Sequence, residues 1–151
     1  TLTDPAGLLD LWRQVYDIEE ANEIQSFHTS ERDPARLMAE IKQVAEGLGG
    51  EYAFTLHAGA SLVAPFVRFN DVHFYVKGDL QAWVDALGLH TVEFGGNVHL
   101  LQPYDEGVFY RLRSPQRMAV VGNIQLYLDL YRYPARGREQ AEFLRDKEIG
   151  F

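Results

Sequence analysis

The sequence predicts one α+β (or α/β) domain, spanning residues 1–151, in which helices cover a mixed β-sheet. Three observations support this fold class. The chain has the length of one domain, and 46 % of its residues are apolar, which is enough to form a core. Helical and strand-like patterns alternate along it. No repeat, low-complexity segment or linker divides the chain.

Two helices with the same start signal are predicted in the first third of the chain. Each begins at an Asp-Pro pair, a capping acid followed by proline at the first helical position. Apolar residues at helical spacing extend the first helix over Pro5–Glu20 and the second over Pro34–Leu48. Gly49 follows the second helix and ends it. Between the two helices we expect an edge strand over Glu23–Thr29.

The middle of the chain alternates strand and helix patterns. Residues 52–55 are typical of a short buried strand, and they lead into a helix of small residues over 57–64 that Pro65 ends. Apolar residues alternate over 72–76, which is the period of a strand. A turn and capping acid then start a helix over 80–87.

The last third begins with β-like segments and ends with two helices. Asn123 is expected to cap a very apolar helix over 124–131, and a final helix is expected over 136–147. Glycine and proline separate the expected strands, which are residues 91–94, 98–101, 108–112 and 118–121.

Composition excludes several classes of site. The chain contains no cysteine, so disulfides and thiolate metal sites are excluded and a reducing compartment fits. No apolar run approaches the roughly 20 residues that span a bilayer. We therefore expect a cytoplasmic protein with no membrane partner. The net charge of −8 argues against a chain that coats nucleic acid over its whole surface.

The charge is unevenly distributed along the chain. Residues 1–110 contain 6 basic and 17 acidic side chains, whereas residues 111–147 contain 8 basic and 4 acidic ones. Seven of those eight basic residues are arginine, which suits bidentate contacts with phosphate or carboxylate. The ordinary interpretation is that several arginines form ion pairs along one helix, Arg138 with Glu142 and Glu142 with Arg145.

Motifs for catalysis are nearly absent. The triplet Gly59-Ala60-Ser61, followed by Asp71, resembles part of a nucleotidyltransferase site, but His73 stands where a second acid would be required. The five histidines form no zinc-type cluster, although His73 and His99 lie on expected strands and could meet across a sheet. We therefore predict no catalytic residue, no metal site and no cofactor.

Three polar residues interrupt the apolar helix near the C-terminus: Asn123, Gln125 and Asp129. A helix that is apolar around most of its circumference is buried, and buried amide and carboxylate groups are costly unless they are hydrogen-bonded. The structural interpretation is that they tie the helix to neighbouring backbone or to an arginine such as Arg136 or Arg138. The functional interpretation is a polar recognition site.

The same region carries a family resemblance. The run Val121-Gly122-Asn123-Ile124-Gln125-Leu126-Tyr127-Leu128-Asp129-Leu130, followed by Pro134, Arg136-Gly137-Arg138-Glu139-Gln140-Ala141-Glu142 and Leu144-Arg145, resembles the C-terminal signature of the AbiEi-type antitoxins. Upstream, Tyr52-Ala53-Phe54-Thr55 and the small-residue helix to Ala64-Pro65 resemble that family's "YALTG…AA…P" stretch, and residues 97–105 resemble a later strand. The resemblance covers most of residues 50–147.

The resemblance implies a non-enzymatic regulator of a type IV (abortive-infection) toxin–antitoxin system, corresponding to its C-terminal domain. It implies negative autoregulation of the operon through operator DNA, which the N-terminal domain of the family binds, and neutralisation of a nucleotidyltransferase-like toxin without a stable complex. The N-terminal winged helix-turn-helix of the family has no counterpart here, because an acidic stretch with Glu19, Glu20 and Glu23 follows the first helix.

The basic C-terminal third is therefore the expected surface for nucleic acid or another anionic partner. An alternative is a metal-dependent nucleotidyltransferase-like or nuclease-like enzyme that brings Asp71, Asp105 and Asp129 together. A second alternative is a dimerisation or protein-docking module that uses the exposed aromatics Tyr131, Tyr133 and Phe151, and a homo-oligomer stays open. The arginines expected to contact the anionic partner are Arg111, Arg113, Arg132, Arg136 and Arg138.

Overall fold

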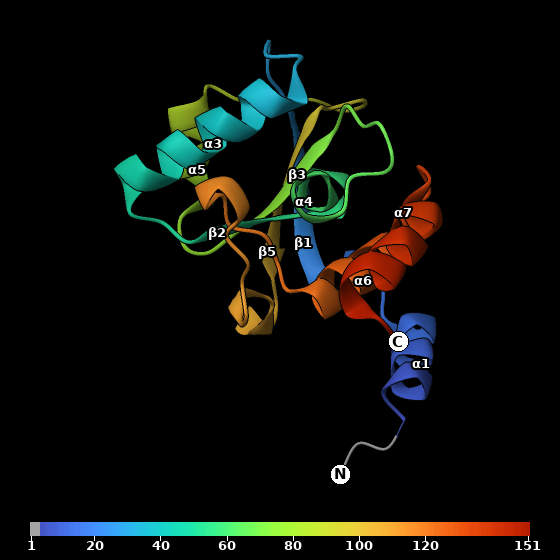
Figure 1. The fold of residues 1–151 in the computed structure, drawn as a ribbon. Helices are drawn as coiled ribbons and strands as arrows, with labels where there is room; N and C mark the ends of the chain where they lie inside the picture. The colour runs from blue at the N-terminus through green and yellow to red at the C-terminus, as the bar shows by residue number, and fades with distance from the viewer. Residues whose placement is uncertain (1–3) are drawn as a thin grey trace.

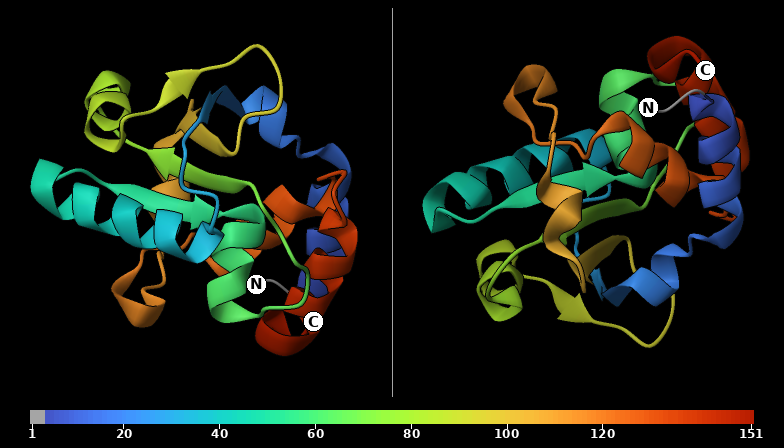
Figure 2. Two further views of the ribbon diagram at one scale, coloured as in Figure 1. Left: turned by 90° about the horizontal axis from the view of Figure 1, so that it is seen from above. Right: turned by 90° about the horizontal axis from the view of Figure 1, so that it is seen from below.

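Side chains alternate along two neighbouring strands, residues 52–55 and 72–76, and divide the sheet into two faces with different partners. Tyr52, Phe54 and Phe74 point to one face, where the ring of Trp83 lies 6.0 Å from Tyr52 and 5.5 Å from Phe74. Thr55 points to the other face and contacts Asp129 of a C-terminal helix. The computed structural model describes residues 4–151, and it places two helical layers on opposite sides of one sheet (Figures 1 and 2). The predicted α+β domain with a mixed sheet is confirmed.

The sheet has five strands in the order β2-β3-β5-β1-β4. The central pair, β3 and β5, runs parallel, and the other neighbouring pairs run antiparallel. Helices α3 and α5 cover one face, and α6 and α7 lie on the other side (Figure 1). The elements are α1 (Pro5–Val15), α2 (Ile18–Ala21), β1 (Asn22–His28), α3 (Pro34–Leu48), β2 (Tyr52–Thr55), α4 (Leu56–Val63), β3 (Val72–Val76), α5 (Leu80–Leu87), β4 (His90–Thr91), β5 (Val98–Pro103), the 3₁₀ helices η1 (Glu106–Phe109) and η2 (Pro115–Arg117), α6 (Asn123–Tyr131), α7 (Gly137–Leu144) and the π-helical turn η3 (Arg145–Ile149).

Elements with strong local signals have the predicted bounds: α3, β2, β3 and α5. Asp33 caps α3 by accepting a hydrogen bond from the amide of Ala35 at 3.0 Å. Gly49 ends that helix in the left-handed conformation, with φ +64°, which glycine adopts without steric cost. The residues that make each of these contacts are only a few positions apart, so the local sequence determines the ends of the helix. Among residues 4–151, no helix is long and apolar enough to cross a membrane.

The predicted helix over 5–20 is wrong as one element, because the chain leaves the helix at Tyr16. Tyr16 is extended, with φ −76° and ψ 133°, and α2 starts after Asp17, whose side chain caps it. The Tyr16 hydroxyl instead donates to Asp129, 113 residues away. A long-range hydrogen bond therefore prevails over helical periodicity.

Three of the predicted C-terminal strands are wrong or shorter. The strand over 91–94 is reduced to β4 (His90–Thr91), and Phe94 beyond it is 89 % exposed. The strand over 108–112 is replaced by η1, which Asp105 caps. Residues 118–121 are not one of the five strands, although Val120 forms single β-bridges with Phe54 of β2 and with Arg113.

The two C-terminal helices are found, with corrected ends. Asn123 is the first residue of α6 rather than its cap, and its side chain accepts from Arg113 instead. The last helix is α7 over Gly137–Leu144, and the chain continues from it as η3.

Leu56 joins β2 to α4 in a conformation that leucine rarely adopts. Its φ is +54° although its side chain is only 2 % exposed. It occupies the position where the "YALTG" stretch has glycine. Nearby, Gly59 of α4 lies close to the end of β2, since an added Cβ would lie only 3.0 Å from the Phe54 carbonyl oxygen. The turn therefore brings α4 tightly against the end of β2.

Candidate functional site

A wholly buried carboxylate joins α6 to the sheet. Asp129 accepts hydrogen bonds from the hydroxyls of Thr55 at 2.5 Å, Tyr75 at 2.7 Å and Tyr16 at 2.8 Å. Gln125, one turn earlier on α6, donates at 2.9 Å. The partners of Asp129 are thus hydroxyls and an amide from four segments, and the expected arginine partner is absent from this set. The predicted pair of Gln125 and Asp129 on one helical face is found.

Burial governs the protonation of this cluster. Removal from water raises the pKa of Asp129, although the four donors oppose that rise. Burial, and then the negative charge of Asp129, also raises the pKa of Tyr16 and of Tyr75. Both phenols therefore stay protonated at neutral pH and donate to the carboxylate. The cluster fastens α6, β2 and β3 together.

A row of polar side chains crosses four strands on the same face. The register aligns Ser26 of β1 with His99 of β5, His99 with His73 of β3, and His73 with Thr55 of β2. The two imidazoles stack with centroids 4.3 Å apart, which confirms the prediction that they meet across the sheet. His99 Nε2 lies 3.1 Å from Asp71 Oδ2, and its Nδ1 lies 2.6 Å from the Ser26 hydroxyl.

The histidine row continues into the loop between α6 and α7. The ring of Tyr133 packs edge-on against both His73, at 5.3 Å, and His57, at 5.4 Å. His57 Nε2 lies 2.6 Å from the Ala135 carbonyl oxygen and donates to it. Burial lowers the pKa of His57 and lowers that of His73 well below its ordinary value. Both imidazoles are therefore neutral at pH 7, and they support the loop as uncharged packing groups.

Helix α1 is fastened to the C-terminal helices by a second polar cluster, which sequence reasoning missed. Arg13 donates to the Tyr127 hydroxyl at 2.8 Å and pairs with Glu142 at 3.4 Å. Arg145 pairs with Asp10 at 2.6 Å and donates to the same Tyr127 hydroxyl at 3.1 Å. The predicted pairing of Glu142 with Arg138 and Arg145 is wrong, because Glu142 accepts from Arg13 and Arg145 pairs with Asp10. Partners more than 100 positions apart leave no local sequence signal.

The aromatics expected at an exposed docking surface have different surroundings. Tyr131 is half-buried, with the Arg13 guanidinium 4.6 Å and the Arg138 guanidinium 4.5 Å from its ring centroid. Tyr133 packs against the histidines, whereas Phe151 is 43 % exposed.

The five arginines named from the sequence lie at both ends of α6. Arg113 pairs with Glu148 at 2.9 Å near the start of the helix, and the exposed Arg111 precedes it in the chain. Nine helical residues span about 13 Å. At the far end, three exposed arginines occupy the end of α6, the loop and the start of α7. These are Arg132, Arg136 and Arg138, which we call the α6–α7 arginines.

Each of the α6–α7 arginines has a partner within the chain. Arg132 donates to the Gln14 carbonyl oxygen, and Arg136 pairs with Glu139 at 2.7 Å. Arg138 stacks on Tyr131 as described above. Exposed ion pairs of this type contribute little to stability, so an anionic ligand can replace Glu139 at small cost.

The acids considered for a metal site are engaged separately. Asp71 binds His99, Asp105 caps η1, and Asp129 is enclosed by its four donors. Ser61 donates to the Ala58 carbonyl oxygen at 2.6 Å. Within residues 4–151, no group of three His, Asp or Glu side chains is arranged to hold a metal ion.

Comparison with known proteins gives one family. The family model described as "Transcriptional regulator, AbiEi antitoxin, Type IV TA system" matches residues 1–150. Searches of the curated proteins and of the solved structures found no match. The matched range includes α1 and the whole sheet as well as the C-terminal run that carries the resemblance.

Proposed function

Because the chain belongs to the AbiEi antitoxin family, the transcriptional regulators of type IV toxin–antitoxin systems, we propose that it represses its own operon and counteracts a nucleotidyltransferase-like toxin without forming a stable complex with it. Its working surface is the group of α6–α7 arginines, and its ligand there is the phosphate backbone of DNA. In this proposal the domain acts by binding and not by making or breaking bonds.

The observation that carries this proposal is that three exposed arginines lie close together in the chain, from the end of α6 to the start of α7. Arg132, Arg136 and Arg138 lie within seven positions of each other and are all exposed. Beneath them the loop is supported by the His57 contact with Ala135, and α6 is fastened by Asp129. A rigid, exposed set of guanidinium groups is suited to phosphate contacts.

Charge elsewhere on the chain supports a restricted contact. The net charge of −8 repels DNA from most of the surface. Binding therefore depends on the arginines, and it weakens with added salt because each phosphate contact releases counterions. Arg111 and Arg113, at the other end of α6, are secondary candidates, since Arg113 already pairs with Glu148.

The repression half of the proposal is tested with a reporter under the promoter of the protein's own operon. The test variant is R132Q/R136Q/R138Q, and the matched control is R32Q/R36Q/K42Q, which removes the same charge from the α3 side of the molecule. We expect the wild type and the control to repress and the test variant to lose repression. Equal repression by all three chains would refute the role of the α6–α7 arginines.

The antitoxin half is tested by growth. The proposal requires a nucleotidyltransferase-like toxin from the same operon. This toxin is expressed from one plasmid, and the chain is supplied on a second one. We expect the chain to restore growth, and an affinity pull-down of the chain to recover no toxin. Failure to restore growth, or recovery of a stoichiometric complex, would contradict a type IV mechanism.

A further inference from the structure

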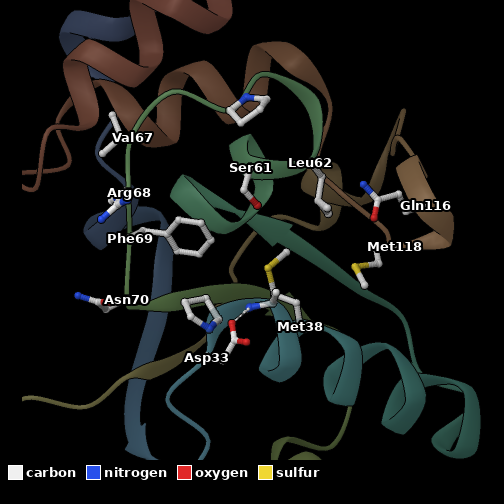
Figure 3. A pocket seen from close by; sticks show the side chains of 13 residues that line it. Asp33, Met38, Ser61, Leu62, Val67, Arg68, Phe69, Asn70, Gln116 and Met118 are labelled. Carbon is white, nitrogen blue, oxygen red and sulfur yellow. Dashed lines mark hydrogen bonds between the residues drawn. The ribbon is translucent and has the colours of Figure 1, made fainter.

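A pocket opens beside the N-terminal end of α3. It encloses 580 Å³, within the range of roughly 300–1,000 Å³ that is usual for small-molecule sites. Figure 3 shows its walls, which come from α3, the end of α4, the loop between α4 and β3, and η2. Its main lining residues are Met38, Ser61, Leu62, Phe69, Gln116 and Met118.

The loop that forms one wall is held in place from behind. The buried side chain of Gln140 on α7 accepts a hydrogen bond from the amide of Val67 at 3.0 Å. The same side chain donates to the Ala64 carbonyl oxygen at 2.7 Å. Phe66 stacks on Phe143 with centroids 4.6 Å apart. A segment without regular structure is thus fixed, and it presents Phe69 toward the pocket (Figure 3).

The opposite wall contains strained backbone. Gln116 and Arg117 of η2 have φ values of +54° and +63°. Non-glycine residues rarely occupy this region, and such strain is concentrated at ligand-binding and active sites. Gln116 lines the pocket directly. The strain therefore lies where a ligand would be contacted.

The lining chemistry restricts the class of ligand. Met38 and Met118 have flexible, polarisable side chains that adapt to apolar ligands. The Ser61 hydroxyl uses its proton on the Ala58 carbonyl oxygen, so its remaining lone pairs can accept a hydrogen bond. The two charged residues of the lining, Arg68 and Asp33, are exposed at the edge of the pocket, and the carboxylate of Asp33 is occupied in capping α3. The interior thus favours a neutral molecule.

We propose that this pocket binds a neutral, mainly apolar small molecule whose hydrogen-bond donor reaches Ser61. The inference goes beyond the proposed function, which requires no small-molecule ligand. A ligand in this pocket would also be connected to the α6–α7 arginines through neighbouring side chains. Phe69 stacks against His57 at 6.4 Å, and His57 holds Ala135 in the loop that carries Arg136. A ligand packed on Phe69 would therefore touch the support of the α6–α7 arginines.

The test is an NMR titration of the full ¹⁵N-labelled chain with 2-naphthol, a neutral aromatic molecule with one hydroxyl donor. We expect saturable shifts of the amides of Ser61, Phe69 and Met118. Replacing Ser61 with alanine should weaken the affinity about fivefold, which corresponds to one neutral hydrogen bond. Shifts spread over exposed apolar side chains, without saturation at these amides, would overturn the proposal.

A pocket-filling variant supplies the matched comparison. Ala35 is exposed at the rim of the pocket, so Ala35→Trp fills it without disturbing the core. Ala86→Trp places the same side chain at an exposed position on α5. We expect A35W to abolish the shifts and A86W to keep them. Unchanged binding in A35W would locate the naphthol elsewhere and refute the site, whatever the outcome of the repression experiment.

Discussion

Replacing Asp129 with alanine should cost more stability than any other change to a single acid considered above. The wholly buried hydroxyls of Thr55 and Tyr75 would lose their acceptor, and each unpaired buried donor costs about 1–3 kcal/mol. Tyr16 and Gln125 already contact each other at 3.0 Å, so they can remain partly satisfied. The expected loss is therefore about 4 kcal/mol in the free energy of unfolding.

Urea unfolding followed by tryptophan fluorescence measures this loss, because unfolding exposes the buried Trp83 to water. With a urea dependence of about 2 kcal/mol per molar, the midpoint should fall by about 2 M. Asp129→Asn keeps one acceptor oxygen, and its hydroxyl partners can rotate to accept from the amide, so it should cost only about 1 kcal/mol. The exposed Asp146→Ala is the control and should change stability by less than about 0.5 kcal/mol. If D129A unfolded at the same urea concentration as D146A, the cluster would not fasten the fold.

Three further predictions concern other parts of the scaffold. Because burial lowers the pKa of His73, near pH 6.5 only the unfolded chain binds a proton at this residue. The contribution of His73 to the free energy of unfolding is therefore fully present above about pH 6.5 and decreases as the pH falls below it. In urea titrations, H73F should lose less stability than the wild type between about pH 7 and about pH 5. Because Leu56 has φ +54°, the variant L56G should be more stable than L56A by about 1 kcal/mol, the reverse of the usual order of these two residues. Thermal unfolding that finds L56A more stable than L56G would contradict backbone strain at this position. Gln140→Ala should leave Val67 and Ala64 unpaired and cost about 2 kcal/mol, and hydrogen exchange at the Val67 amide should accelerate; unchanged exchange would show that Gln140 does not hold the loop.

Elements whose determinants are local could be predicted from the sequence. Asp33 and Asp79 cap their helices through amides two positions away, and Gly49 and Gly88 end those helices in the left-handed conformation. The two-residue period of the strand pattern also put His73 on a strand, so its contact with His99 across the sheet could be predicted. In each case the interacting residues are adjacent or the pattern itself fixes which face a side chain occupies.

Elements that depend on distant partners could not be predicted. Tyr16 leaves its helix for a carboxylate 113 positions later, and no helical pattern records that contact. Residues 108–112 have strand-like composition, but Asp105 caps a 3₁₀ turn there instead. Strand propensity expresses packing against neighbours, so it fails where a segment finds no partner edge.

In the candidate site, too, features set by local sequence could be predicted and features set by distant contacts could not. The sequence identified the arginines, the polar residues of α6 and the family resemblance, because these depend on residue type and order. Most of the Asp129 donors, the Arg13 contacts and the walls of the pocket beside α3 come from segments that are distant in the sequence, so they became visible only in the structure.

The central claim is that the α6–α7 arginines contact DNA phosphates, and the salt dependence of binding tests it most directly. Fluorescence anisotropy with labelled promoter DNA, repeated over a range of salt concentrations, gives the slope of log Kobs against log salt for each chain. Three lost phosphate contacts should make the slope of R132Q/R136Q/R138Q shallower than that of the wild type by about 3, whereas R32Q/R36Q/K42Q should keep the wild-type slope. Identical slopes for the wild type and the α6–α7 variant would contradict the account.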